Sequence, residues 1–119
     1  MKNRMIPPGA WQSFFEDFNR RHRERLVNVA IVGEKIGAQR EARRLPLNGL
    51  VADSPGEAIS ILLGGAQGTT IDHPVEEPVE VWVEMDETGA ELAIEILSRN
   101  GNKTILEFWP PAAGKSPSG

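Results

Sequence analysis

The chain has 119 residues, a formal net charge of −4 and no cysteine. Its length predicts a single domain, because domains of roughly 100–150 residues are the commonest. The lack of cysteine excludes a disulfide framework, a thiolate zinc site and a cysteine nucleophile. The sequence contains no apolar run of about 18 residues that could cross a membrane and no signal-peptide segment at its N-terminus. We therefore expect a cytoplasmic protein that does not contact membranes.

Charge is divided unevenly along the chain. Residues 1–45 carry a balance of +5, whereas residues 46–119 carry −9. Such a division can mark a surface for a charged partner, since a local potential depends on local charges. It can equally arise when a basic and an acidic segment of one small domain attract each other, and we favour this second interpretation.

The first regular element is a predicted helix over about residues 8–22. Its aromatic residues recur at intervals of three and four, which is the spacing of an amphipathic helix: Trp11, Phe14, Phe15, Phe18 and His22. Pro7 and Pro8 suit a helix start, where a missing N–H does no harm. A stripe of this size needs a broad apolar surface, and we expect that surface to be a sheet.

The middle of the chain alternates between apolar and polar residues, which is typical of strands. We predict strands over about 25–33, 38–45 and 49–53, with an interruption at Pro46 that places this proline at a bulge or an edge. A type II turn over residues 53–56 precedes a further strand with Ile59, Ile61 and Leu63 on one side. Residues 69–78 are expected to be short and extended, with Pro74 and Pro78 limiting their pairing.

The last third predicts an antiparallel meander of three strands, because the links are too short for parallel crossovers. One face is fully apolar and should be core: Val79, Val81, Val83, Met85, Leu92, Ile94, Ile96, Leu106 and Phe108. Side chains alternate faces, so cross-strand partners must share a face. This parity requires a three-residue loop, Arg99-Asn100-Gly101, which pairs Ser98 with Asn102 and Ile94 with Leu106.

Together these elements predict an α+β domain over residues 1–109. One N-terminal helix packs on a twisted antiparallel sheet of five to seven strands, which could curl toward a barrel. Residues 110–119 are rich in Pro, Gly and Ser, and we predict that they form a disordered tail.

Signals for an enzyme are weak. The two histidines are His22, expected to cap or pack at the helix end, and His73. Asp72 precedes His73, but neighbours on a strand point to opposite faces, so a dyad between them is not expected. A small enzyme using His73 is the least favoured of three hypotheses, and we predict no metal and no cofactor.

Two surfaces remain as candidates for binding. Arginines cluster at residues 20–25 and 40–44, and as anion-binding candidates they could contact phosphates: Arg20, Arg21, Arg40, Arg43 and Arg44. A small β domain that binds nucleic acid through them is the alternative hypothesis. It is disfavoured, because no recognised nucleic-acid module accompanies them and the second half of the chain is acidic.

The second surface is the polar-and-aromatic face of the meander. Tryptophans alternate there with glutamates, and aromatic residues are enriched where proteins bind partners. The candidates for partner binding are Trp82, Glu84, Glu95 and Trp109. Another segment of the chain could instead cover both rings. Our leading hypothesis is a small non-enzymatic binding or protein-interaction module, with a partner protein or a second copy of the chain on this face.

Three segments resemble a family of short bacterial proteins classed only as a domain of unknown function. They are IGAQREARRLPLNGLVAD, HPVEEPVEVWVE and the final hairpin around its Asn-Gly turn. The resemblance covers about residues 8–109 and implies a bacterial origin and a helix that precedes a strand-rich body. It implies no activity, cofactor or site residue.

Overall fold

The structure is a computed structural model that describes residues 2–53 and 57–110. Its elements in chain order are β1 (Lys2–Ile6), the 3₁₀ turn η1 (Pro8–Ala10), α1 (Trp11–His22), β2 (Leu26–Gly33), β3 (Gly37–Ala52), β4 (Ala58–Gly64), the 3₁₀ turn η2 (Ala66–Gly68), β5 (Thr70–Glu76), β6 (Pro78–Met85), β7 (Glu91–Ser98) and β8 (Lys103–Phe108). Most of the predicted turn at 53–56 and of the predicted tail lies outside the described residues.

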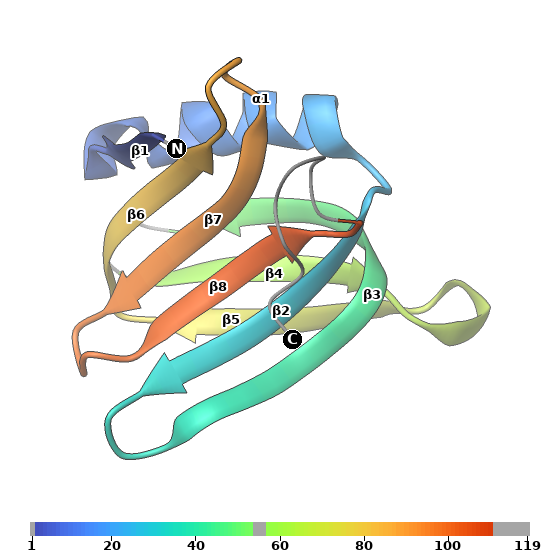
Figure 1. Ribbon diagram of the computed structural model, residues 1–119. Coiled ribbons are helices and arrows are strands. Elements are labelled where there is room, and N and C mark those ends of the chain that lie inside the picture. The colour runs from blue at the N-terminus through green and yellow to red at the C-terminus, as the bar shows by residue number, and fades with distance from the viewer. Residues whose placement is uncertain (1, 54–56, 111–119) are drawn as a thin grey trace.

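All strands join one antiparallel sheet in the order β1-β6-β7-β8-β2-β3-β4-β5, with α1 packed against it (Figure 1). The predicted α+β class is confirmed. The predicted number of strands, five to seven, is wrong, because the sheet has eight. The sheet curves strongly but does not close into a barrel, so β1 and β5 are its two edges.

The strand that the sequence does not reveal is β1. Four of its five side chains are exposed and only Ile6 is buried, so it carries no apolar alternation. Its backbone nevertheless pairs with β6 from Lys2 opposite Met85 to Ile6 opposite Val81. An edge strand with one exposed side needs few core residues, because backbone hydrogen bonds to its neighbour hold it.

Pro46 does not interrupt β3, contrary to the sequence-based expectation. The strand runs continuously from Gly37 to Ala52, pairing first with β2 and then with β4. Pro46 lies opposite Leu26 at the end of the first pairing, and a register shift between Leu47 and Gly49 follows. The proline therefore sits beside a bulge where the strand changes partners, and the lost N–H is tolerated there.

Residues 70–76 pair with β4 along their whole length, although Pro74 was expected to limit pairing. Pro74 is tolerated because β5 is an edge strand, where one side of the backbone has no neighbour.

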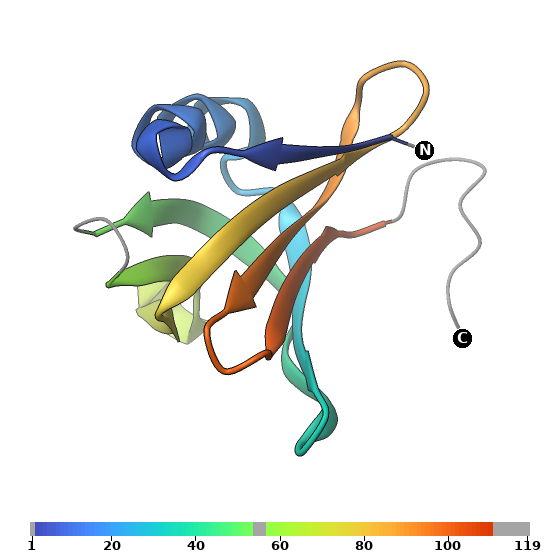
Figure 2. The ribbon, with the colours of Figure 1, turned by 90° about the vertical axis from the view of Figure 1, so that its left-hand side faces the viewer.

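The predicted helix is confirmed, and its aromatic stripe fills the core. Trp11, Phe15 and Phe18 are buried, and the Phe18 ring lies 5.8 Å from the ring of Phe108 on β8. The indole N–H of Trp11 donates to the carbonyl of Ile6, at 2.9 Å. Figure 2 looks along α1 and shows it over one end of the space between β6–β8 and β3–β5.

The meander and its register are confirmed. Ile94 pairs with Leu106, the amide of Ser98 donates to the carbonyl of Asn102, and Gly101 has a φ of 91°. A left-handed glycine is what the three-residue loop requires. Two expected core residues differ: Val79 is 36% exposed and Met85 is only partly buried. A register shift between Pro78 and Glu80 accompanies the exposure of Val79, and a second shift between Glu84 and Met85 leaves Met85 packed at the margin of the core.

The sheet therefore has two faces around β6–β8. The inner face packs on α1 and carries the core. We call the opposite side of β1, β6, β7, β8 and β2 the outer face. None of the helices among the described residues is long and apolar enough to cross a membrane.

Candidate functional site

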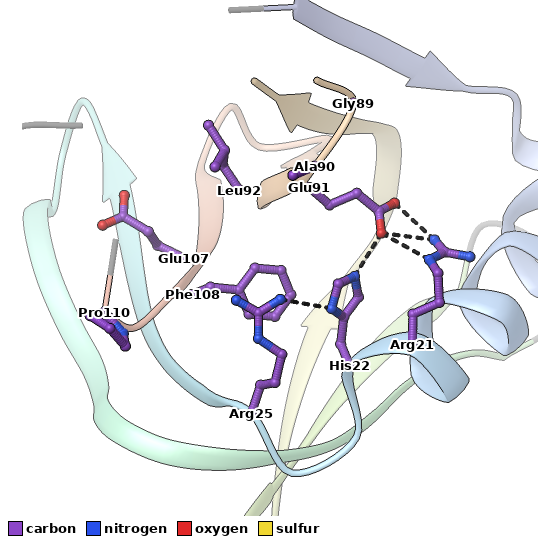
Figure 3. Close-up of a pocket in the computed structure, with 10 residues that line it drawn as sticks. All are labelled: Arg21, His22, Arg25, Gly89, Ala90, Glu91, Leu92, Glu107, Phe108 and Pro110. Carbon is purple, nitrogen blue, oxygen red and sulfur yellow. Dashed lines mark hydrogen bonds and ion pairs between the residues drawn. The ribbon is translucent and has the colours of Figure 1, made fainter. Parts of the chain in front are cut away.

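A hollow in the surface lies where α1 ends, next to the start of β7 and the end of β8 (Figure 3). We call it the helix-end hollow, and its volume is about 300 Å³. Its described lining residues are Arg21, His22, Arg25, Gly89, Ala90, Glu91, Leu92, Glu107, Phe108 and Pro110. Charged groups thus face one another across apolar walls.

His22 and Glu91 form the centre of this hollow. The His22 ring is buried between Phe18 and Phe108, with ring centroids 4.6 and 4.5 Å away. Its Nε2 lies 2.6 Å from an oxygen of Glu91 on β7. The helix and the strand bring together two residues 69 positions apart, and the aromatic packing fixes the ring plane that points at the carboxylate.

Arg21 holds the same carboxylate from the other side. Its guanidinium makes contacts of 2.8–3.1 Å with both oxygens of Glu91, a bidentate arrangement that is stronger than a single ion pair. Burial raises the pKa of Glu91, but the hydrogen bond from His22 and the Arg21 ion pair lower it by more, so this pKa lies below its ordinary value.

Arg25 completes the chain of contacts. Its guanidinium carbon lies 4.1 Å from the centroid of the Phe108 ring, and one N–H group lies 3.0 Å from His22 Nδ1. An arginine can only donate, so Nδ1 accepts and the proton of the neutral ring resides on Nε2. His22 then donates to Glu91, and both ring nitrogens have partners.

The contact with Arg25 limits what His22 can do in this hollow. A histidine oriented by a carboxylate is the usual form of a general base, but here Arg25 occupies the nitrogen that a base would use. The described lining residues include no hydroxyl or thiol that could act as a nucleophile. A ligand in the hollow would meet the Arg25 guanidinium group and the apolar side chains of Leu92, Phe108 and Pro110.

Replacing Glu91 should change how stability depends on pH. A carboxyl group whose folded pKa is depressed stabilises the fold above its unfolded pKa, and this contribution is lost as the pH falls through the folded value. The ordinary value for Glu91 is 4.5. Glu91→Gln should therefore lower the free energy of unfolding at pH 7, and the difference from the wild type should shrink as the pH falls below about 4.5.

Urea denaturation at several pH values between 7 and 3 measures this difference. Glu87→Gln is a matched control, because Glu87 is an exposed glutamate in the neighbouring turn. A Glu91→Gln deficit that stays constant across this pH range would show that the carboxylate's charge is not what stabilises the helix end.

A second hollow lies on the outer face around Trp82. It has a volume of about 330 Å³ and is lined by Asn3, Glu80, Trp82, Glu95, Leu97 and Lys103. The Trp82 ring is half-buried, and its N–H donates to Glu80 at 2.9 Å. Glu95 lies directly across from Trp82 on β7 and forms an ion pair with Lys103 at 3.4 Å. We call this the Trp82 hollow.

The four sequence-predicted candidates for partner binding are only partly gathered. Trp82 and Glu95 share the Trp82 hollow, whereas Glu84 lies one row away, opposite Asn3 and Ala93. Trp109 follows β8, and the Arg44 guanidinium carbon lies 4.2 Å from its ring centroid. The outer face therefore presents one open tryptophan hollow and one tryptophan stacked against an arginine.

The sequence-predicted anion-binding arginines are spread over several contacts. Arg20 pairs with Asp17, Arg21 with Glu91, and Arg44 with the Trp109 ring. Arg40 and Arg43 are exposed on β3. Three of the five thus have contacts within the chain, and binding of nucleic acid through them remains a disfavoured prediction.

His73 lies on β5, opposite Ile61, and its Nε2 is buried without a hydrogen-bond partner. Asp72 is opposite Leu62 on the other face of the strand. Within the described part of the chain, no group of three histidine, aspartate or glutamate side chains is placed to hold a metal ion. The site that sequence reasoning did not find is His22 with Glu91, because no local pattern connects residues so far apart.

Comparison with known proteins adds a family but no activity. The chain matches the Family of unknown function (DUF5335) over residues 2–117. A relative from Aquifex aeolicus (strain VF5), named "Uncharacterized protein", is 29% identical over 110 residues, which cover 92% of this chain and 95% of the relative. No solved structure matches.

Proposed function

Because the chain belongs to the DUF5335 family of unknown function, we propose a function from its geometry: a non-catalytic protein-interaction module that binds a partner through the Trp82 hollow. The partner segment presents a lysine or arginine side chain next to an apolar residue. The observation that carries the proposal is a half-buried indole between two carboxylates, Glu80 and Glu95, on a sheet face that α1 does not cover.

The chemistry of the Trp82 hollow favours a cation. Tryptophan is the best aromatic partner for a cationic group, and a contact of this kind is worth about 0.5–2 kcal/mol. Carboxylates at the rim add electrostatic attraction and orientation. The same chain contains such a contact between Arg44 and Trp109. Glu95 is paired with Lys103 at 3.4 Å, and an incoming cation would compete with this partly exposed lysine.

Apolar side chains extend the surface beyond the hollow. Trp82 lies opposite Met5 on β1, and Leu97 lies opposite Lys103, which in turn lies opposite Val32 on β2. Met5 is 47% exposed and Val32 40% exposed. Exposed apolar groups that line up with an aromatic anchor are typical of interaction sites, whereas scattered ones are ordinary.

Selection from a displayed peptide library tests the proposal, with purified full-length protein as bait. We expect the selected peptides to share a lysine or arginine beside an apolar residue. Trp82→Ala should weaken binding of such a peptide roughly thirtyfold, since an anchor residue at an interface centre costs about 2 kcal/mol or more on truncation. Fluorescence anisotropy of the labelled peptide measures the affinity.

Trp109→Ala is the matched control, because this second tryptophan lies outside the hollow, and it should leave the affinity unchanged. Thermal melts should show both variants folded. Selected peptides without a basic residue, or equal binding by Trp82→Ala, would refute the proposal. The alternative is that a second copy of the chain binds the Trp82 hollow, and sedimentation equilibrium tests it. A wild-type dimer that Trp82→Ala dissociates would assign the outer face to this second copy.

A further inference from the structure

We infer that the helix-end hollow is a second binding site, which takes the oxyanion group of a small molecule, a carboxylate or a phosphate, with Arg25 as its anchor. This inference is independent of the proposed function, since the hollow lies at the end of α1 and shares no lining residue with the Trp82 hollow.

Arg25 is the charged group that carries the inference. Its side chain lines the hollow, its guanidinium carbon lies over the Phe108 ring at 4.1 Å from the centroid, and it donates to His22 Nδ1 at 3.0 Å. Neither contact neutralises it, because an aromatic ring and a neutral imidazole carry no net charge. A guanidinium group has five N–H donors in one plane, and the edge directed at His22 accounts for one. The contacts with Phe108 and His22 hold the guanidinium group at the hollow, and its planar array of donors suits bidentate binding of an oxyanion.

The other charged side chains that line the hollow are Arg21, Glu91 and Glu107. Glu91 is held by both Arg21 and His22, and the Arg21 guanidinium group compensates its negative charge. The Glu107 side chain projects to the side of the hollow away from His22 and Glu91 (Figure 3).

The remaining walls suit the carbon body of a ligand. Leu92, Phe108 and Pro110 supply the apolar part of the lining, with Phe108 against the guanidinium group (Figure 3). A volume of about 300 Å³ is at the small end of the usual range for ligand pockets, roughly 300–1,000 Å³. The structure therefore favours a small acid over a nucleotide or a polymer.

NMR titration of the full-length protein with benzoate and, separately, with inorganic phosphate tests this inference at low ionic strength. The chain has two histidines, and His73 does not line the hollow. We expect the His22 ring signals to shift in a saturable manner while those of His73 stay in place. Benzamide has the shape of benzoate without its charge, so it should bind at least tenfold more weakly. Comparing benzoate with phosphate shows which oxyanion the site takes.

Arg25→Gln removes the charge but keeps an amide that can donate to His22, so the fold should persist. It should weaken binding about tenfold or more, as expected when a charge-assisted hydrogen bond is lost. Arg23→Gln is the matched control, an exposed arginine two residues earlier, and should bind like the wild type. Unchanged His22 signals with both anions, equal binding of benzamide and benzoate, or full binding by Arg25→Gln would each overturn the inference.

Discussion

Phe18→Ala should cost about 3–5 kcal/mol of folding free energy, the usual range for a buried phenylalanine. The Phe18 ring is fully buried and lies against three other rings, those of Phe14, His22 and Phe108. Its loss leaves a cavity between α1 and β8 that the rigid sheet cannot fill. Since small domains are stable by only about 5–15 kcal/mol, this one substitution removes a large share of the total. Equilibrium denaturation with urea measures it.

Phe14→Ala provides the comparison on the same helix. Phe14 is only partly buried and packs on the edge of the core, so we expect a loss near 1 kcal/mol, the typical cost of a point mutation. If Phe18→Ala also lost less than about 1 kcal/mol, the helix would not be docked on the sheet as described.

Asn19→Ala should be the second most damaging change, at about 2–4 kcal/mol, because it leaves two part-buried backbone groups without partners and each fully buried one costs about 1–3 kcal/mol. The Asn19 side chain pairs with the backbone of Leu50 on β3, accepting from its N–H at 2.8 Å and donating to its carbonyl at 2.9 Å. Leu50 is buried, so water cannot easily replace these two bonds.

Gly49 explains why this contact is possible. A Cβ atom there would lie 3.2 Å from the Asn19 amide nitrogen, so a side chain at this position would crowd the Asn19 amide group. Urea melts of Asn19→Ala can be compared with Asn48→Ala, an exposed asparagine on the same strand as Leu50, which should change stability by less than about 0.5 kcal/mol. Equal effects of the two substitutions would mean that the Asn19 bonds contribute no net stability.

One arginine–glutamate ion pair within the domain joins the basic and the acidic parts of the chain. Arg21, from the basic first half, binds Glu91, from the acidic second half. This contact follows the expectation that the two segments attract each other. Other basic residues of the first half remain at the surface, among them Arg25, whose side chain faces the helix-end hollow.

Local periodicity was sufficient for the helix and for most strands. The aromatic spacing from Trp11 to Phe18 predicts the buried side of α1, and alternation predicts the inner face of the three C-terminal strands. Parity even fixes the hairpin register around Gly101. These features are encoded locally, because each depends on which side chains within a few residues share a face.

Side-chain patterns did not predict features that depend on contacts between distant residues or on backbone pairing alone. β1 pairs through its backbone, with four exposed side chains, so no hydrophobic pattern marks it. Pro46 was expected to interrupt a strand, and the bulge at Leu47–Gly49 that accommodates it depends on how β3 passes from β2 to β4. The position of Val79 depends on a register shift in β6 that alternation cannot reveal.

The sequence by itself determined the α+β class, the amphipathic helix and the outward position of Trp82, because these follow from side-chain periodicity within single elements. Only the tertiary structure decided that Trp82 and Glu95 share a hollow that excludes Trp109, and that His22 meets Glu91 across 69 positions. Such contacts depend on where α1 ends relative to β7 and β8, and thus on packing of the whole core. A short-range pattern contains no information about that placement.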